Sequence, residues 1–154
     1  MLSAIQVRAL KAQPTLVIKA TTTMEEYGAA LARILPEVWQ FAVSRGIEPS
    51  GPPFARFLAF HPDDTGELEA GITIPDAVAG EGCVEASELP SGEAAVVIYT
   101  GAYDQIGEAH MALGAWVREN RRETAGPSWE SYITDPGSEP DPAKWQTEVF
   151  WPIR

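Results

Sequence analysis

An internal repeat is the feature that most constrains how this chain of 154 residues can fold. Three short landmarks occur in the same order in both halves, separated by 75 to 80 residues. The matched pairs are Gly51–Phe57 with Gly126–Tyr132, Val17–Thr21 with Val97–Gly101, and Ile72–Pro75 with Val149–Pro152. The repeat predicts one domain over residues 1–154, with repeat one at about 1–77 and repeat two at about 81–154.

Each half has the pattern of two strands, a helix and two further strands. Runs rich in β-branched residues predict the strands, and apolar residues at a spacing near 3.6 predict the helices. We therefore expect an α+β fold with pseudo-two-fold symmetry, in which the halves share one sheet or face each other across a central groove. The predicted elements are Ile5–Leu10, Leu16–Thr22, a helix over 24–44, Phe54–Phe60 and Leu68–Ile74, then Val84–Leu89, Ala94–Thr100, a helix over 104–122, Trp129–Thr134 and Trp145–Ile153.

Local signals refine this pattern. Thr22 or Thr23 can cap the first helix, and Gly46 is placed to end it. Pro36 lies within the helical pattern, where it removes one backbone hydrogen bond and predicts a kink. In each half we expect the first two strands to pair with each other, because Pro14 and the Pro90–Gly92 segment are typical of turns.

Charge and cysteine content limit the class of partner. Eleven Lys and Arg against 22 Asp and Glu give a net charge of −11, which repels phosphate backbones and anionic lipids. We expect no nucleic acid or membrane partner, and cationic ligands or a basic protein partner remain open. The single cysteine, Cys83, forms no internal disulfide and suits a reducing, cytoplasmic compartment. No signal peptide or membrane span is recognisable.

No sequence motif for a metal, a cofactor or a catalytic triad is present, so we expect none of these groups. His61 precedes a proline in a predicted loop, and we interpret it as a surface residue. His110 lies within the second predicted helix, and we interpret it as a packed or surface residue without a catalytic role.

Carboxylates and aromatic residues coincide on the last two predicted strands. Strand alternation places Glu130 and Tyr132 on one face of their strand, and Glu148 and Phe150 on one face of theirs. If these strands form a hairpin, the four side chains can converge on one surface. A dehydrated carboxylate beside rings favours a bound cation, or a raised pKa suited to acid–base chemistry. The alternative is a solvated glutamate on a half-covered sheet, with the rings in the core.

Four segments resemble the GyrI-like small-molecule-binding family, which includes effector-binding domains of multidrug-responsive MerR-type and AraC-type regulators. The resemblance is clearest over about residues 83–154, and the first half fits the internal duplication of the family more loosely. The segments that carry the resemblance are Glu88–Val96, Tyr99–Ile106, Gly126–Tyr132 and Thr147–Ile153.

The resemblance implies a tandem pair of strand–helix–strand–strand (SHS2-type) units around a groove that binds bulky, hydrophobic, often aromatic and cationic molecules. It implies that Glu130 is the recurring acidic residue, with Glu148 as a second acidic position. We expect sequestration or detoxification of drugs or toxins. The ligand-binding residues expected on this basis are Glu130, Tyr132, Glu148, Phe150, Phe57, Trp39, Tyr103 and Trp116.

Two other functions stay open at this point. Some stand-alone members of the family hydrolyse cyclopropane-bearing DNA-alkylating natural products, and in that reaction Glu130 would activate water while Tyr132 stabilises developing charge. A protein-binding gyrase inhibitor is the third possibility. Direct transcriptional regulation is not expected, because the sequence has no basic recognition helix. In the first half Ala55 stands where Glu130 stands in the second, so only one half carries the acidic residue.

Overall fold

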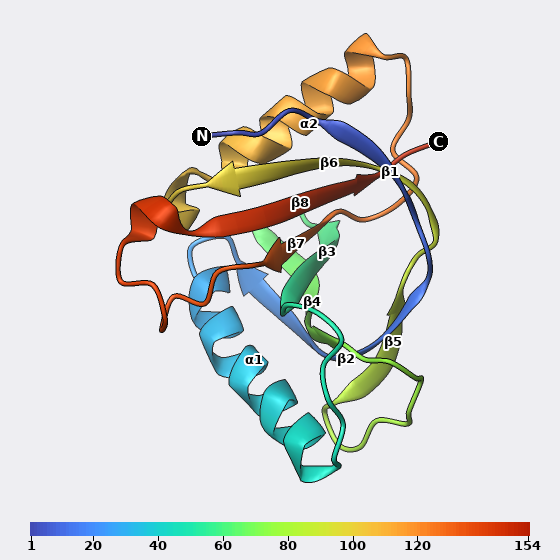
Figure 1. The fold of residues 1–154 in the computed structure, drawn as a ribbon, viewed down its shortest axis with the longest axis vertical. Helices are drawn as coiled ribbons and strands as arrows, with labels where there is room; N and C mark the ends of the chain where they lie inside the picture. The colour runs from blue at the N-terminus through green and yellow to red at the C-terminus, as the bar shows by residue number, and fades with distance from the viewer. The chain divides into compact units, whose positions relative to one another are not determined.

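The computed structural model describes residues 1–154 and divides into two compact units. We name each unit after the residue that it carries at equivalent places in its sheet. The Ala55 unit comprises Lys11–Ser91. The Glu130 unit comprises Met1–Leu10 together with Gly92–Arg154. Each unit is a mixed α/β structure with one helix packed on antiparallel strands (Figure 1).

The Ala55 unit has four antiparallel strands in the order β3-β4-β2-β5. Helix α1 packs on β2 and β4 and buries Ile34, Val38 and Ala42, which lie four residues apart on one helical face. The elements are β2 (Gln13–Thr23), α1 (Tyr27–Ser44), β3 (Phe54–Phe60), β4 (Thr65–Thr73) and β5 (Glu85–Leu89).

The Glu130 unit has the strand order β7-β8-β6-β1, again antiparallel throughout. Helix α2 lies along β6 and β8 (Figure 1). It buries Ala109, Leu113 and Val117 against the apolar side chains Val97 and Val149. The elements are β1 (Gln6–Leu10), β6 (Gly92–Thr100), a 3₁₀ helix η1 (Tyr103–Gln105), α2 (Gly107–Glu119), β7 (Trp129–Tyr132), a 3₁₀ helix η2 (Pro142–Lys144) and β8 (Gln146–Pro152).

The pairing of the first two strands of each half corrects the prediction from sequence. Strand β1 pairs with β6 rather than with β2, and β5 pairs with β2 rather than with β6. Leu10 lies opposite Gly92, and Gln13 lies opposite Leu89. The chain therefore does not turn back on itself between β1 and β2, nor between β5 and β6. The reason is local: Lys11 and Ala12 do not favour the positive φ angles of a two-residue hairpin turn.

The helix boundaries differ slightly from prediction. Helix α1 begins at Tyr27, because the Thr23 hydroxyl accepts the Glu26 amide and closes a turn ahead of the helix. Gly46 follows the helix with φ +67°, as expected for a C-terminal glycine. The second helical segment is split into η1 and α2, and it ends before Arg121, which has φ +54°. Neither helix is long and apolar enough to cross a membrane.

Pro36 provides a test of this helix. It lies exposed in the middle of α1, which continues on both sides of it. Replacing Pro36 by Ala should raise the free energy of unfolding by about 1–2 kcal/mol, because it restores an amide donor and removes a steric clash. The restored freedom of the unfolded chain offsets part of the gain. Urea denaturation, with the exposed Gln40→Ala as control, measures the change, and a lower stability of the Pro36→Ala variant would contradict the prediction.

Candidate active or ligand-binding site in the Glu130 unit

Glu130 is a buried carboxylate on β7, and 2% of its surface is exposed. Its backbone lies opposite Val149 of β8. Opposed residues of antiparallel strands point to the same face, so the side chains of Glu130, Tyr132 and Val149 share one face. Because Val149 packs against α2, this is the face that the helix covers. Alternation along β8 places Trp151 on it as well.

The register of β7 and β8 corrects the expected convergence of four side chains. Glu148 lies opposite Ser131, and Phe150 lies opposite Trp129, so both point away from the Glu130 face. The Trp129 and Phe150 rings stack with centroids 5.0 Å apart. Alternation fixes the faces within one strand, whereas the register between strands depends on the length of their connection, here a 13-residue segment. The prediction assumed a register shifted by one residue.

Neutral donors hold the carboxylate of Glu130. The Tyr132 hydroxyl donates to Oε1 at 2.9 Å. His110 Nε2, from α2, lies 2.7 Å from Oε2. Behind it, the indole Nε1 of Trp151 donates to His110 Nδ1 at 3.0 Å. A hydrogen-bond chain therefore runs from β8 through α2 to β7, and it ends on Glu130.

The charge state of His110 follows from this chain. An indole N–H can only donate, so Nδ1 of His110 accepts and carries no proton. The ring proton is therefore on Nε2 and is donated to Glu130, which acts as an acceptor. His110 is neutral in this arrangement, and the carboxylate accepts from two uncharged groups. The Glu130 carboxyl group therefore lies in the protein interior with hydrogen bonds from two neutral groups and without an ion pair to an arginine or a lysine.

Two other glutamates show how the chain ordinarily compensates such a charge. Glu69 is equally buried, and its carboxylate lies 3.5 Å from the Arg56 guanidinium and accepts from Ser87. Glu148 forms an ion pair with Arg8 at 2.7 Å. Burying an ion is costly unless it is paired, so the lack of an arginine at Glu130 calls for an explanation.

Aromatic rings adjoin the Tyr132 end of this network. The Tyr103 ring, from η1, meets Tyr132 edge-on with centroids 5.6 Å apart. The Trp145 ring also contacts Tyr103, with centroids 5.0 Å apart. Burial, together with the charges of Asp135 and Glu130, raises the pKa of the Tyr103 hydroxyl above its ordinary value, so Tyr103 stays neutral. Trp145 was not among the predicted site residues, because it precedes its strand and alternation does not place it.

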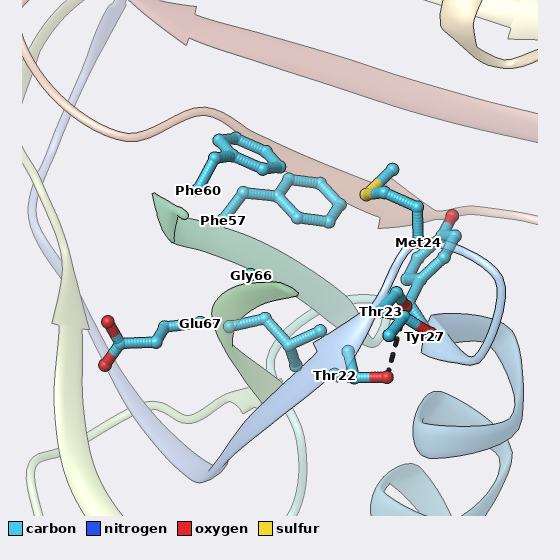
Figure 2. Close-up of a pocket in the computed structure, with 9 residues that line it drawn as sticks. Thr22, Thr23, Met24, Tyr27, Phe57, Phe60, Gly66 and Glu67 are labelled. Atoms are coloured by element: carbon cyan, nitrogen blue, oxygen red, sulfur yellow. Dashed lines mark hydrogen bonds between the residues drawn. The ribbon is translucent and has the colours of Figure 1, made fainter. Parts of the chain in front are cut away.

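Three predicted ligand-binding residues lie elsewhere in the fold. Trp116 packs against the apolar cluster beneath α2. Trp39 and Phe57 belong to the Ala55 unit, where Trp39 is 49% exposed on α1. Phe57 lines a shallow surface pocket with a cavity volume of only about 10 Å³. Figure 2 shows the Phe57, Phe60 and Tyr27 rings in this pocket and the Glu67 carboxylate pointing away from them. That carboxylate lies 2.8 Å from His61.

His110, which the sequence led us to interpret as a packed or surface residue, is part of the polar network in the structure. Its side chain is 24% exposed, and both ring nitrogens form hydrogen bonds. One signal in the sequence points to this position. When the second half is aligned on the first with an offset of 75 residues, His110 falls on Leu35 and Glu130 falls on Ala55. The histidine and the glutamate therefore replace apolar residues in the same half.

The sequence and the fold match a known family. The model of the GyrI-like small-molecule-binding domain matches residues 3–154, and the chain belongs to that family. The search among curated proteins returned no match.

Solved structures with the same fold include two of EcmrR. The EcmrR C-terminal domain is 19% identical, with a TM-score of 0.83, and the match covers 98% of this chain and 97% of that domain. The EcmrR–DNA complex matches at 20% identity and a TM-score of 0.81, and the match covers 98% of this chain but 57% of the EcmrR chain.

Two further solved structures with the same fold are a ligand-bound protein and a hydrolase. SAV2435 bound to tetraphenylphosphonium is 14% identical, with a TM-score of 0.71 and coverage of 99% and 94% of the two chains. A hydrolase from Listeria innocua is 13% identical, with a TM-score of 0.68 and coverage of 97% and 91%. At these identities the likeness concerns the fold alone.

Proposed function

We propose that this chain binds bulky, hydrophobic, aromatic cations at Glu130, as a small-molecule-binding domain that sequesters drugs or toxins. The buried carboxylate without a cationic partner carries the proposal. In the unliganded protein its charge is held only by Tyr132 and His110, both neutral donors. A ligand that brings a positive charge into the interior would supply the missing partner and recover Coulomb energy at low effective dielectric.

The neighbouring rings suit the rest of such a ligand. Tyr132, Tyr103 and Trp145 form an aromatic group beside the carboxylate. Rings contribute apolar contact and attract a cation that lies over their faces within about 6 Å. Glu130 is 2% exposed, so binding requires a side chain to move aside. We propose that Tyr103 moves, because it is half-buried and contacts both Tyr132 and Trp145. The binding of tetraphenylphosphonium by the similar SAV2435 supports this ligand class.

The two units are proposed to be tandem SHS2-type repeats of one domain, about residues 1–77 and 81–154, with their outer strands exchanged. Both follow the order strand, helix, strand, strand. In both, the second strand after the helix lies between the strand before the helix and the first strand after it. Both contain an edge-on ring pair, Tyr27 with Phe57 and Tyr103 with Tyr132, at 5.9 Å and 5.6 Å.

Comparison of the units explains why the polar network points to function. The register places Ala55 and Ile72 where the Glu130 unit has Glu130 and Trp151. The buried faces of the helices place Leu35 where the other has His110. Phe57 corresponds to Tyr132. All four counterparts are apolar, so the same fold is built without these hydrogen bonds. The polar residues are therefore not a requirement of the architecture.

Calorimetric titration of the unmodified protein tests the proposed function. Tetraphenylphosphonium and tetraphenylborate have nearly the same size and shape and opposite charge. We expect tetraphenylphosphonium to bind and tetraphenylborate to bind at least about 100-fold more weakly, since reversing a charge near a buried carboxylate changes attraction into repulsion. Similar affinities for both ions would show that shape alone governs binding and would overturn the proposal.

Hydrolysis of strained electrophiles is the second candidate, and the orientation of Glu130 favours it. Each carboxylate oxygen already accepts one hydrogen bond, which fixes its direction and leaves a lone pair for a water molecule. In this reaction Glu130 would accept a proton from water as the water oxygen bonds to a cyclopropane carbon, and the electrons of the broken ring bond would pass to a conjugated carbonyl. Incubation with excess alkylating agent, beside Glu130→Gln, separates turnover from binding by chromatography with mass detection.

Glu148 provides a matched control for the charge. Its carboxylate is already paired with Arg8 and faces away from Glu130. Glu148→Gln should therefore change tetraphenylphosphonium affinity by less than about 3-fold and lower stability by at most about 1 kcal/mol, the range of partly exposed ion pairs. Calorimetry and urea denaturation measure these effects. A loss of affinity as large as that of Glu130→Gln would place the cation on the opposite face of the sheet.

A further inference from the structure

Trp151 lies behind His110 and is the first donor of the chain that ends on Glu130. Its indole Nε1 donates to His110 Nδ1 at 3.0 Å, with ring centroids 6.1 Å apart. The indole ring packs against α2 at Gly114, where a Cβ would lie 3.4 Å from it, at ordinary van der Waals distance. Trp151 therefore lies against the helix that carries His110.

The indole donor decides which nitrogen of His110 carries the proton. A neutral imidazole has one N–H and one acceptor nitrogen, and an imidazolium has two N–H groups. With Trp151 donating to Nδ1, the neutral ring with its proton on Nε2 satisfies both contacts. The tautomer with its proton on Nδ1 would direct two donors at each other and a lone pair at the Glu130 carboxylate.

The negative charge that Glu130 offers to a ligand depends on whether His110 is neutral or doubly protonated. A neutral His110 orients Glu130 by a hydrogen bond of 2.7 Å and leaves its full negative charge. An imidazolium in the same place would form an ion pair with Glu130 and compensate the charge, as Arg8 does for Glu148. The titratable group in contact with His110 Nε2 is Glu130, and the other carboxylate oxygen of Glu130 accepts from the Tyr132 hydroxyl.

We propose that Trp151 is a positioning residue that sets the specificity of the Glu130 site for cations, by holding His110 as the neutral tautomer protonated on Nε2. This inference rests on the proposed function. It assigns roles to His110, which contacts Glu130, and to Trp151, which contacts His110. The Ala55 unit supports it, because Leu35 and Ile72 occupy the corresponding positions where no carboxylate needs to be oriented.

Trp151→Phe is the test variant, because it keeps an aromatic ring in the same place and removes only the N–H donor. Long-range ¹H–¹⁵N correlation spectra report the tautomer directly, and the chain has only two histidines, so a His61→Gln variant identifies the His110 signals. In the unmodified protein at neutral pH we expect the neutral form with its proton on Nε2. In Trp151→Phe we expect the Nδ1-protonated and doubly protonated forms to appear.

The binding readout compares tetraphenylphosphonium with the neutral triphenylphosphine oxide. Trp151→Phe should lower the preference for the cation about 3- to 10-fold, since part of the population pairs Glu130 with an imidazolium. His110→Gln should keep most of the preference, because its amide both accepts from Trp151 and donates to Glu130. His110→Lys, which places a fixed cation on Glu130, should abolish the preference.

The outcomes separate this inference from the proposed function. If the unmodified protein does not prefer the cation, the proposed function fails, and so does the specificity assigned to Trp151. If it prefers the cation while Trp151→Phe shows an unchanged His110 tautomer and an unchanged preference, the function stands and the role of Trp151 is overturned. Thermal unfolding of each variant shows whether a lost preference comes from a folded protein.

Discussion

Replacing Glu130 by Gln is expected to lower the affinity for tetraphenylphosphonium by about 30- to 100-fold. A unit charge about 5 Å from the carboxylate, at an effective dielectric near 20, interacts by about 3 kcal/mol, and desolvation of the ligand offsets a part of it. The affinity for neutral triphenylphosphine oxide should change by less than about 3-fold, because the shape of the site is kept. Calorimetric titration of both ligands measures the two effects.

Stability is the control for this variant. Glutamine can still accept from His110, and its amide can donate to the Tyr132 hydroxyl, so Glu130→Gln should stay within about 1 kcal/mol of the unmodified protein in free energy of unfolding. Glu148→Gln serves as the matched loss of one carboxylate from the same sheet. Equal losses of affinity for the cation and for the neutral ligand would show that Glu130 shapes the site without recognising charge.

Placing a glutamate at the corresponding position of the other unit should be strongly destabilising. Ala55 is fully buried, and the positions that correspond to His110, Tyr132 and Trp151 are Leu35, Phe57 and Ile72, none of which donates a hydrogen bond. Ala55→Glu therefore buries a carboxylate without the donors that hold Glu130. We expect a loss of at least about 3 kcal/mol, or a decrease in melting temperature of about 10 °C.

Ala55→Leu separates the charge from the added volume. Overpacking by leucine should cost about 1–3 kcal/mol, so the glutamate variant should be the less stable of the two. Thermal unfolding followed by circular dichroism measures both. If Ala55→Glu is as stable as Ala55→Leu, a buried carboxylate needs no dedicated donors in this fold, and Tyr132 and His110 are not required to hold Glu130.

Most of the elements could be predicted from the sequence, because they depend on short-range patterns. The β3 bounds Phe54–Phe60 are those predicted, and Gly46 ends α1 as expected. The exchange of β1 and β5 between the units could not be predicted. It depends on whether Lys11–Ala12 and Pro90–Ser91 reverse the chain, and proline and serine are common both in turns and at strand edges.

The candidate site could be predicted only in part, because alternation within a strand is a short-range pattern whereas the pairing between strands is not. Alternation correctly places Glu130 and Tyr132 on one face, where they form a hydrogen bond. It gives no register between β7 and β8, and a shift by one residue moves Glu148 and Phe150 to the opposite face. His110 and Trp151 were not among the predicted site residues, because they come from other elements. Tertiary packing alone brings His110 to Glu130 and Trp151 to His110.

The position of a bound cation tests the account most directly. Tetraphenylarsonium is close in size and shape to tetraphenylphosphonium, and anomalous scattering locates its arsenic atom in a crystal of the complex. We predict an arsenic peak within about 6 Å of the Glu130 carboxylate, the range in which a buried charge and aromatic rings both attract a cation. A peak beside Phe57 and Phe60, or beside Glu148, with none near Glu130, would contradict the proposal that Glu130 recognises the ligand.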